Sequence, residues 1–249
     1  MDQIDSLPTA AAQPLAFVGR ARELSALRDV FERAMSGAGS VATLAGAAGI
    51  GKTRTAREFA ISARQAGAIV LHGACYEGQW APPYGPFVEA FTAYVRSAEA
   101  STLRDDLGFG AAPIARVINV VRERLPDTPQ PEPLQPDEER LRLFDAFGEF
   151  VRTTSLHHPL VLILDDLHWA EGGTIALLRY LARFAPEQRL LIVGTYRDLE
   201  PDADHPLNDL LGSFRRESMY ERILLMENGE LGNANPADTP GSQGLHPWL

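Results

Sequence analysis

A short glycine-rich segment has the residue types and spacing needed to hold a phosphate group. Residues Gly46-Ala47-Ala48-Gly49-Ile50-Gly51-Lys52-Thr53 match the pattern G-x-x-x-x-G-K-[ST] at every fixed position. Glycines let the backbone wrap closely around an anion, so that successive N–H groups and the positive end of the following helix face it. We expect Lys52 to contact the β- and γ-phosphates of a nucleotide and the Thr53 hydroxyl to bind Mg²⁺. The alternative is a Gly/Ala-rich turn that ends in Lys-Thr by chance.

Two carboxylates follow an apolar run later in the chain. Val161 to Leu164 predicts a buried strand, and Asp165 and Asp166 come directly after it. The carboxyl ends of parallel strands line the ligand crevice of an α/β sheet, so these acids should face the phosphate loop. We expect Asp165 to hold Mg²⁺ and Asp166 to orient or deprotonate the attacking water. Taken alone, two Asp after a strand are more often a solvated turn or a helix cap.

A third strand end carries a cation. Val193-Gly194-Thr195-Tyr196-Arg197 again passes from apolar to polar residues at the same expected edge of the sheet. Arg197 is placed to stabilise a γ-phosphate, and we expect it to be the only cation of this chain besides Lys52 aimed at the transferred group. The alternative for Arg197 is a surface salt bridge to Asp198 or Glu200. For Trp169, buried packing is favoured over contact with a ligand.

Alternating helices and strands would position these residues. Apolar runs predict strands over 41–45, 68–71, 160–164, 190–195 and 222–225, and helical spacing of apolar residues predicts helices between most of them. Strands separated by helices imply a parallel sheet that is covered on both faces. The fold class is therefore α/β, of the P-loop type.

The region 76–158 interrupts this alternation and is predicted to be a helical insertion. Two amphipathic helices are separated by Pro126 to Pro136, which contains five prolines and should be an extended linker. The domain is expected to span 17–225. Residues 1–16 should form a flexible segment, and 226–249, rich in Asn, Gly, Pro, Asp and Ser, a disordered tail.

Bulk composition excludes several protein classes. The 249 residues carry a formal net charge of −10, which disfavours a general nucleic-acid binder. The single cysteine, Cys75, cannot form an internal disulfide and is expected to be a core residue rather than a catalytic thiol. Neither a signal peptide nor a membrane-spanning segment is indicated, so the cytoplasm is the expected location.

Several motifs in order resemble the AAA-like ATPase module of STAND-class signalling ATPases, as found in large bacterial MalT/LuxR-type regulators and adenylate-cyclase-linked ATPases. They are 17–20 with Glu23, the phosphate loop, 75–78 with 82–84, 162–170 and 194–198. The resemblance implies a five-stranded core in which the Thr195 strand lies between the loop strand and the Asp165 strand. It places Val18, Gly19 and Arg20 near adenine and ribose. It also implies a switch driven by ATP binding and hydrolysis. From the net charge and the lack of a membrane-length apolar stretch, we expect neither direct nucleic-acid contacts nor membrane contacts of this chain.

The similarity stops near Leu225, where such proteins usually continue into a helical lid and further domains. We therefore expect a truncated or solitary module that hydrolyses ATP slowly and acts with a protein partner or by self-association. A module that holds ATP or ADP without hydrolysing it is the main alternative. A small-molecule kinase is a third and less favoured alternative; its lid would use Arg116, Arg122 and Arg124 of the insertion. A GTPase is disfavoured because no Asn-Lys-x-Asp element is present.

Overall fold

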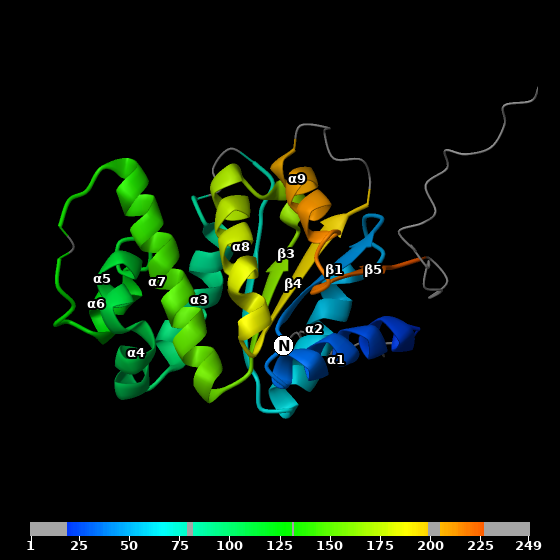
Figure 1. Ribbon diagram of the computed structural model, residues 1–249, viewed down its shortest axis with the longest axis horizontal. Coiled ribbons are helices and arrows are strands. Elements are labelled where there is room, and N and C mark those ends of the chain that lie inside the picture. The colour runs from blue at the N-terminus through cyan, green and yellow to red at the C-terminus, as the bar shows by residue number, and fades with distance from the viewer. Residues whose placement is uncertain (1–18, 79–81, 131, 199–204, 227–249) are drawn as a thin grey trace, which may run out of the picture.

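A five-stranded parallel sheet organises the chain (Figure 1). The computed structural model describes residues 19–78, 82–130, 132–198 and 205–226. Every strand pair is parallel, and the spatial order is β2-β3-β4-β1-β5. The strands are β1 (Ser40–Gly46), β2 (Ile69–Ala74), β3 (Leu160–Asp165), β4 (Leu190–Arg197) and β5 (Tyr220–Leu224). The predicted α/β fold is confirmed, and β4 lies between β1 and β3 as the resemblance implied.

Helices cover both faces of the sheet, which explains why the central strands carry apolar residues on both faces. Along β3, Leu160, Leu162 and Leu164 face one core, whereas Val161 and Ile163 face the other. The second core is covered by α1 (Ala21–Met35) and α2 (Lys52–Gln65). The first is covered by α8 (Gly172–Phe184), α9 (Pro206–Phe214) and the helices between β2 and β3. Short 3-10 turns span Leu167–Trp169 and Ala185–Glu187.

The second strand is longer than its apolar run. The predicted strand ended at Leu71, but β2 continues to Ala74, because each of its residues pairs with β3, from Ile69 opposite Leu160 to Ala74 opposite Asp165. Gly73 has a packing reason to lack a side chain, since a Cβ there would lie 1.8 Å from the backbone oxygen of Pro86. The end of β2 therefore contacts the start of the next helix directly.

The described residues between β2 and β3 form helices and no strand, on one side of the molecule (Figure 1). These are α3 (Gly85–Ser97), α4 (Ala100–Leu107), a 3-10 turn (Gly108–Gly110), α5 (Ala111–Ile114), α6 (Val120–Arg124) and α7 (Pro136–His157). Aromatic rings join α3 to α7: Phe91 lies 4.8 Å from Phe147 and 4.7 Å from Phe150, measured between ring centroids. The described part of the proline-rich stretch before α7 is neither helix nor strand.

Both predicted terminal segments fall outside the described residues, apart from Met226. The expected domain boundaries therefore stay predictions. Within the described ranges, each helix is too short or too polar to cross a membrane.

Candidate nucleotide-binding site

The glycine-rich loop connects the end of β1 to the start of α2. Gly46, Gly49 and Gly51 have φ angles of 156°, 73° and 101°, a region that residues with side chains rarely adopt. A Cβ at Gly46 would lie 2.8 Å from the backbone oxygen of Leu225, whereas at Gly49 or Gly51 it would enter open space. The backbone is therefore approachable from outside, directly before the N-terminus of α2, and the loop fits a phosphate group.

Lys52 is held against the loop that precedes it. Its side chain is buried, and its Nζ donates to the backbone oxygens of Gly46 at 3.0 Å and Ala47 at 2.8 Å. An ammonium group has three N–H donors, so one remains for a ligand. Burial lowers the pKa of Lys52, and the negative charge of Asp166 opposes this effect.

An open cavity of about 690 Å³ lies beside the loop and brings most of the predicted site together. Lys52, Thr53, Asp166 and Arg197 all line it. Asp165 does not, because its side chain is 4% exposed. The cavity wall also includes residues of α2 that the sequence prediction did not single out: Arg54, Arg57 and Glu58. Lys52 and Arg197 are thus not the only cations of the chain at this cavity, and the expectation that they alone are aimed at the transferred group stays a prediction.

The two acids are joined by a residue of the neighbouring strand. The Thr195 hydroxyl donates to the buried Asp165 carboxylate, and the backbone N–H of Asp166 donates to the same hydroxyl oxygen at 2.9 Å. Asp166 has a φ of 56°, which turns the chain away from the sheet after β3. Thr195 was not among the predicted site residues. Its signal was a polar residue inside an apolar run, but only the pairing of β3 with β4 reveals its partners.

We expect Thr195→Val to destabilise the fold by about 1–3 kcal/mol, because it leaves a buried carboxylate and an N–H group without their shared partner. Urea unfolding followed by circular dichroism would measure this change. Thr43→Val is the matched control, since Thr43 is also buried and its hydroxyl bonds Tyr220 at 2.7 Å. Only Thr195→Val should also weaken magnesium-dependent nucleotide binding. Equal effects of the two variants on that binding would contradict a role for Thr195 at the site.

The charges around Asp166 shape its proton affinity. Burial and the adjacent Asp165 raise the pKa of Asp166, while Lys52 and Arg197 oppose the rise. His168 lies close by, with its Nδ1 3.9 Å from Oδ1 of Asp166, and neither ring nitrogen has a hydrogen-bond partner among the described residues. Burial and the charges of Arg197, Lys52 and His205 lower the pKa of His168 to about 4. At neutral pH this ring is uncharged, with one donor and one acceptor beside Asp166.

Cys75 contributes to packing. It is buried at the end of β2, and its backbone N–H donates to the oxygen of Asp165 at 2.9 Å. Burial, with the charges of Asp166, Asp165 and Glu89, raises the pKa of the thiol to about 12. The thiolate required of a nucleophile is therefore scarce at neutral pH, in keeping with the predicted core role.

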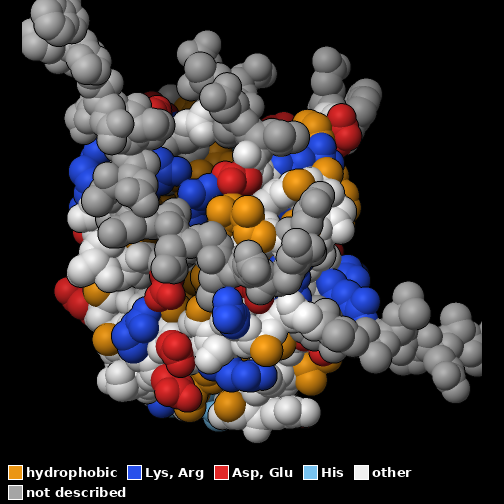
Figure 2. All heavy atoms as spheres, turned by 90° about the vertical axis from the view of Figure 1, so that its right-hand side faces the viewer, with side chains coloured by type: hydrophobic (Ala, Val, Ile, Leu, Met, Phe, Trp, Pro, Cys, Tyr) orange, Lys and Arg blue, Asp and Glu red, His pale blue; other side chains and the backbone are white. Residues whose placement is uncertain are grey.

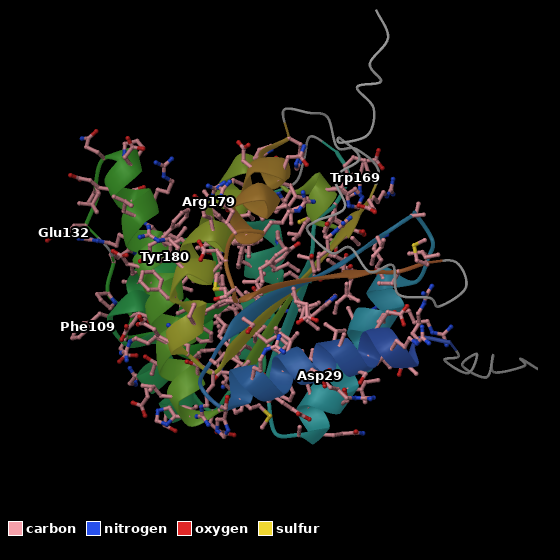
Figure 3. All side chains as sticks on the ribbon, turned by 45° about the vertical axis from the view of Figure 1, so that its right-hand side comes forward. Asp29, Phe109, Glu132, Trp169, Arg179 and Tyr180 are labelled. Carbon is pink, nitrogen blue, oxygen red and sulfur yellow. The ribbon has the colours of Figure 1, made fainter. Side chains whose placement is uncertain are left out.

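Arg197 is positioned by an aromatic ring. Its guanidinium carbon lies 5.4 Å from the ring centroid of Trp169, which is half-buried at the edge of the sheet where β3 ends (Figure 3). The alternative salt bridge to Asp198 is not formed, because Asp198 pairs with Arg222 instead. Glu200 lies outside the described residues. Trp169 thus supports a cation that lines the cavity.

The predicted adenine and ribose contacts are described only in part. Val18 lies outside the described residues, and Gly19 has a φ of 92° before α1. Arg20 donates to the buried Glu23 at 2.7 Å, to the backbone oxygen of Ile50 at 3.0 Å and to that of Met226 at 2.8 Å. Arg20 therefore connects the phosphate loop to α1 and to the chain that leaves β5.

Three solved structures illustrate what the chain is similar to. A chain of Drosophila ORC bound to DNA is 15% identical with a TM-score of 0.41, and the match covers 81% of this chain and 90% of that one. C. elegans PCH-2 is 13% identical with a TM-score of 0.40, and the match covers 84% of this chain and 43% of that one. A STAND protein with a tetratricopeptide repeat sensor from Pyrococcus horikoshii is 16% identical with a TM-score of 0.41. That match covers 86% of this chain and 24% of the STAND protein.

The family comparison is more specific. No curated protein gives a significant match. The model of the AAA ATPase domain matches residues 16–193, which is more than half of the chain. The matched range includes the phosphate loop, Asp165 and Asp166, the same residues that the structure brings to one edge of the sheet. The chain therefore belongs to the AAA ATPase domain family.

Proposed function

We propose that the chain is a Mg-ATP-binding switch module that hydrolyses the β-γ phosphoanhydride slowly. The observation that carries this proposal is the convergence of Lys52, Thr53, Asp166 and Arg197 on one open cavity beside the phosphate loop. Phosphoryl transfer to water requires a loop that binds phosphate, an oxygen ligand for the metal, a carboxylate that positions the water and a second cation.

Each residue has a distinct role in this proposal. The N–H groups of Gly46 to Thr53 and the remaining donor of Lys52 bind the phosphates. The Thr53 hydroxyl and the Asp165 carboxylate offer the oxygen ligands that Mg²⁺ prefers, and Thr195 holds Asp165 in place. When bound, the metal neutralises charge on the phosphate oxygens.

Asp166 is the proposed base. It lines the cavity, and a carboxylate there can accept a hydrogen bond from a water molecule and align it with the γ-phosphate. Arg197, supported by Trp169, lines the same cavity and would stabilise the charge that develops on the transferred group.

The kinase alternative loses its support in the insertion. Arg116 pairs with Glu139, Arg122 donates to the backbone oxygen of Thr128, and Arg124 donates to that of Arg96. All three hold the helical region together and none lines the phosphate cavity. The non-hydrolysing alternative uses the same loop, so only an assay of turnover separates it from the proposal.

Partner proteins rather than nucleic acids are the proposed contacts. The net charge of −10 opposes a nucleic-acid backbone. On the face shown in Figure 2, basic and acidic side chains are interspersed. Self-association or a partner would supply a further arginine in trans, which is worth roughly 10³ to 10⁵ in rate in related chemistry.

We expect the isolated chain to turn over far more slowly than the typical ~10 s⁻¹ of enzymes. Steady-state phosphate release, measured over a series of protein concentrations, should rise per molecule as the chain associates. Asp166→Asn controls for contaminating ATPases. Turnover close to that typical value in a dilute, demonstrably monomeric sample would show that the chain assembles a complete active site alone and would contradict the proposal.

A further inference from the structure

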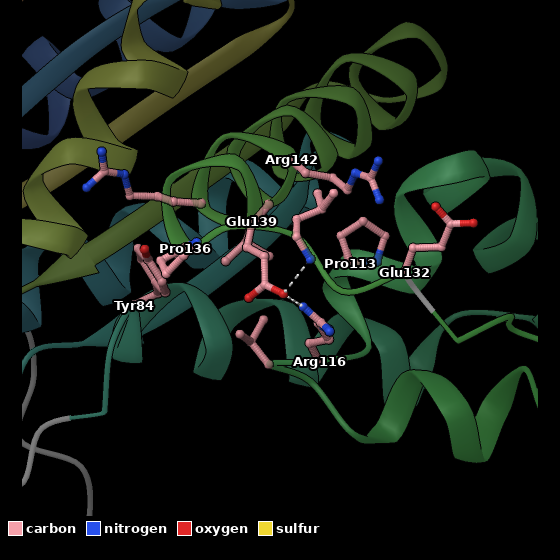
Figure 4. A pocket seen from close by; sticks show the side chains of 11 residues that line it. Tyr84, Pro113, Arg116, Glu132, Pro136, Glu139 and Arg142 are labelled. Carbon is pink, nitrogen blue, oxygen red and sulfur yellow. Dashed lines mark hydrogen bonds and ion pairs between the residues drawn. The ribbon is translucent and has the colours of Figure 1, made fainter.

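A second cavity lies in the helical region (Figure 4), and its lining includes no residue of the phosphate loop. It has a volume of about 250 Å³, and its walls come from α5, the chain that follows it, α7 and the chain before α7. The apolar part of the wall includes Pro113, Val117, Leu134 and Leu143. A small, mostly apolar hollow with a few polar groups is the usual form of a small-molecule site.

Hydrogen bonds fix the shape of this cavity. Arg116 donates to Oε1 of Glu139 in α7, and the backbone N–H of Leu134 donates to the same oxygen at 3.4 Å (Figure 4). One carboxylate thereby joins three segments of the wall. The charge of Arg116 compensates that of Glu139, so this pair leaves the cavity neutral on balance.

The remaining charges make the cavity positive. Arg142 lines it and has no hydrogen bond or ion pair to any described residue. Arg140 also lines it, and its 3.3 Å contact with Asp137 is exposed to solvent and therefore weak. Glu132 is the one carboxylate of the lining besides Glu139. Two arginines thus face one glutamate, in a chain whose net charge is −10.

An adjacent hollow has the opposite character. Pro113 and Arg142 also line this space, but so do the two carboxylates Asp145 and Glu149. Anions are therefore favoured in the first cavity only, and its volume limits the ligand to a small molecule.

Tyr84 connects the first cavity to the nucleotide site. Its ring lines the cavity, packs edge-on against Phe144 with centroids 5.9 Å apart, and lies over Gly173, where a Cβ would be 3.4 Å from the ring. Gly173 belongs to the first turn of α8, which follows the segment containing Asp165 and Asp166. Tyr84 itself has a φ of 61°, a conformation that its neighbours must maintain.

We propose that this cavity binds a small organic anion, with an apolar body of about one ring and an acid group bound by Arg142, and that Tyr84 transmits its presence to the nucleotide site. The apolar wall takes the body and the uncompensated arginine takes the acid group. The transmission, unlike the binding, rests on the proposed function.

The binding test uses phenylacetate and phenylacetamide, which share a shape and differ in charge. Calorimetric titration should show saturable binding of phenylacetate, with a dissociation constant on the order of 1 mM. Phenylacetamide should bind at least about tenfold more weakly, and Arg142→Ala should weaken phenylacetate by about tenfold. Arg28→Ala, an exposed arginine of α1, should change nothing. Equal binding of the two probes, or unchanged phenylacetate binding by Arg142→Ala, would overturn the site.

The same probe separates the cavity from the nucleotide site. Lys52→Ala, which removes the loop cation, should still bind phenylacetate like the wild type. In the wild type, saturating phenylacetate should change ADP affinity at least about threefold, and ADP should change phenylacetate affinity by the same factor. Val117→Trp, which fills the cavity, should abolish both effects. If phenylacetate binds but ADP affinity stays constant, the transmission through Tyr84 is refuted while the proposed ATPase site is untouched.

Discussion

Lys52→Ala should weaken the binding of a non-hydrolysable ATP analogue by about 100-fold or more, because the phosphates lose the cation that the loop itself supplies. In the folded chain its Nζ is already held by the oxygens of Gly46 and Ala47, so little reorganisation precedes phosphate binding. Isothermal titration with Mg²⁺ present would measure the loss.

Two controls make this result interpretable. Lys52→Met keeps the apolar stem of the buried side chain and should lose affinity to a similar extent, which would assign the loss to the charge. Arg57→Ala removes a cation from the same cavity but outside the loop, and should have a much smaller effect. Unchanged affinity in a folded Lys52 variant would mean that 46–53 is only a turn.

Asp166→Asn should preserve nucleotide binding and lower turnover by roughly 10²- to 10⁴-fold, since an amide cannot take a proton from water. Asp165→Ala should instead reduce the dependence of binding on magnesium. The burial of Asp165 beneath Thr195 and the position of Asp166 on the cavity wall support this division. Asp165→Asn, which keeps the shape of the side chain, separates loss of charge from loss of packing.

Turnover should also depend on pH in a defined direction. The base must be ionised to act. Burial raises the pKa of Asp166 above the usual 3.8 of an aspartate, so the rate should fall as the pH is lowered toward that raised pKa. Phosphate release measured over a pH series would report this fall in rate.

The variants of the two acids also have a contradicting outcome. Equal effects of the Asp165 and Asp166 variants on binding and rate would contradict the separate roles.

The predictable parts of the site are those contained in contiguous sequence. The phosphate loop could be identified because its pattern is local, and β3 because a buried parallel strand needs an apolar run that ends at its ligand edge. Val18 to Arg20 were assigned by resemblance alone, and their contact with a nucleotide stays a prediction.

The remaining parts depend on tertiary pairing. Thr195 joins Asp165 to Asp166 because the register sets Leu164 opposite Gly194, and no spacing along one chain reveals a register. Likewise, Arg57 reaches the cavity because of the direction in which α2 leaves the loop. The length of β2 was underestimated because His72 and Gly73 lack the apolar character of a buried strand.

Chemical modification of Lys52 tests the account most directly, because it is the only lysine in the sequence. An amine-directed reagent can therefore be followed at one side chain by mass spectrometry of the peptide that contains it. With a non-hydrolysable ATP analogue and Mg²⁺ at saturation, we expect modification of Lys52 to slow by about tenfold or more, since the phosphates would cover its remaining donor. Free lysine in the same solution controls for the reagent. An equal modification rate with and without bound nucleotide would place the nucleotide elsewhere and contradict the assignment of the phosphate loop.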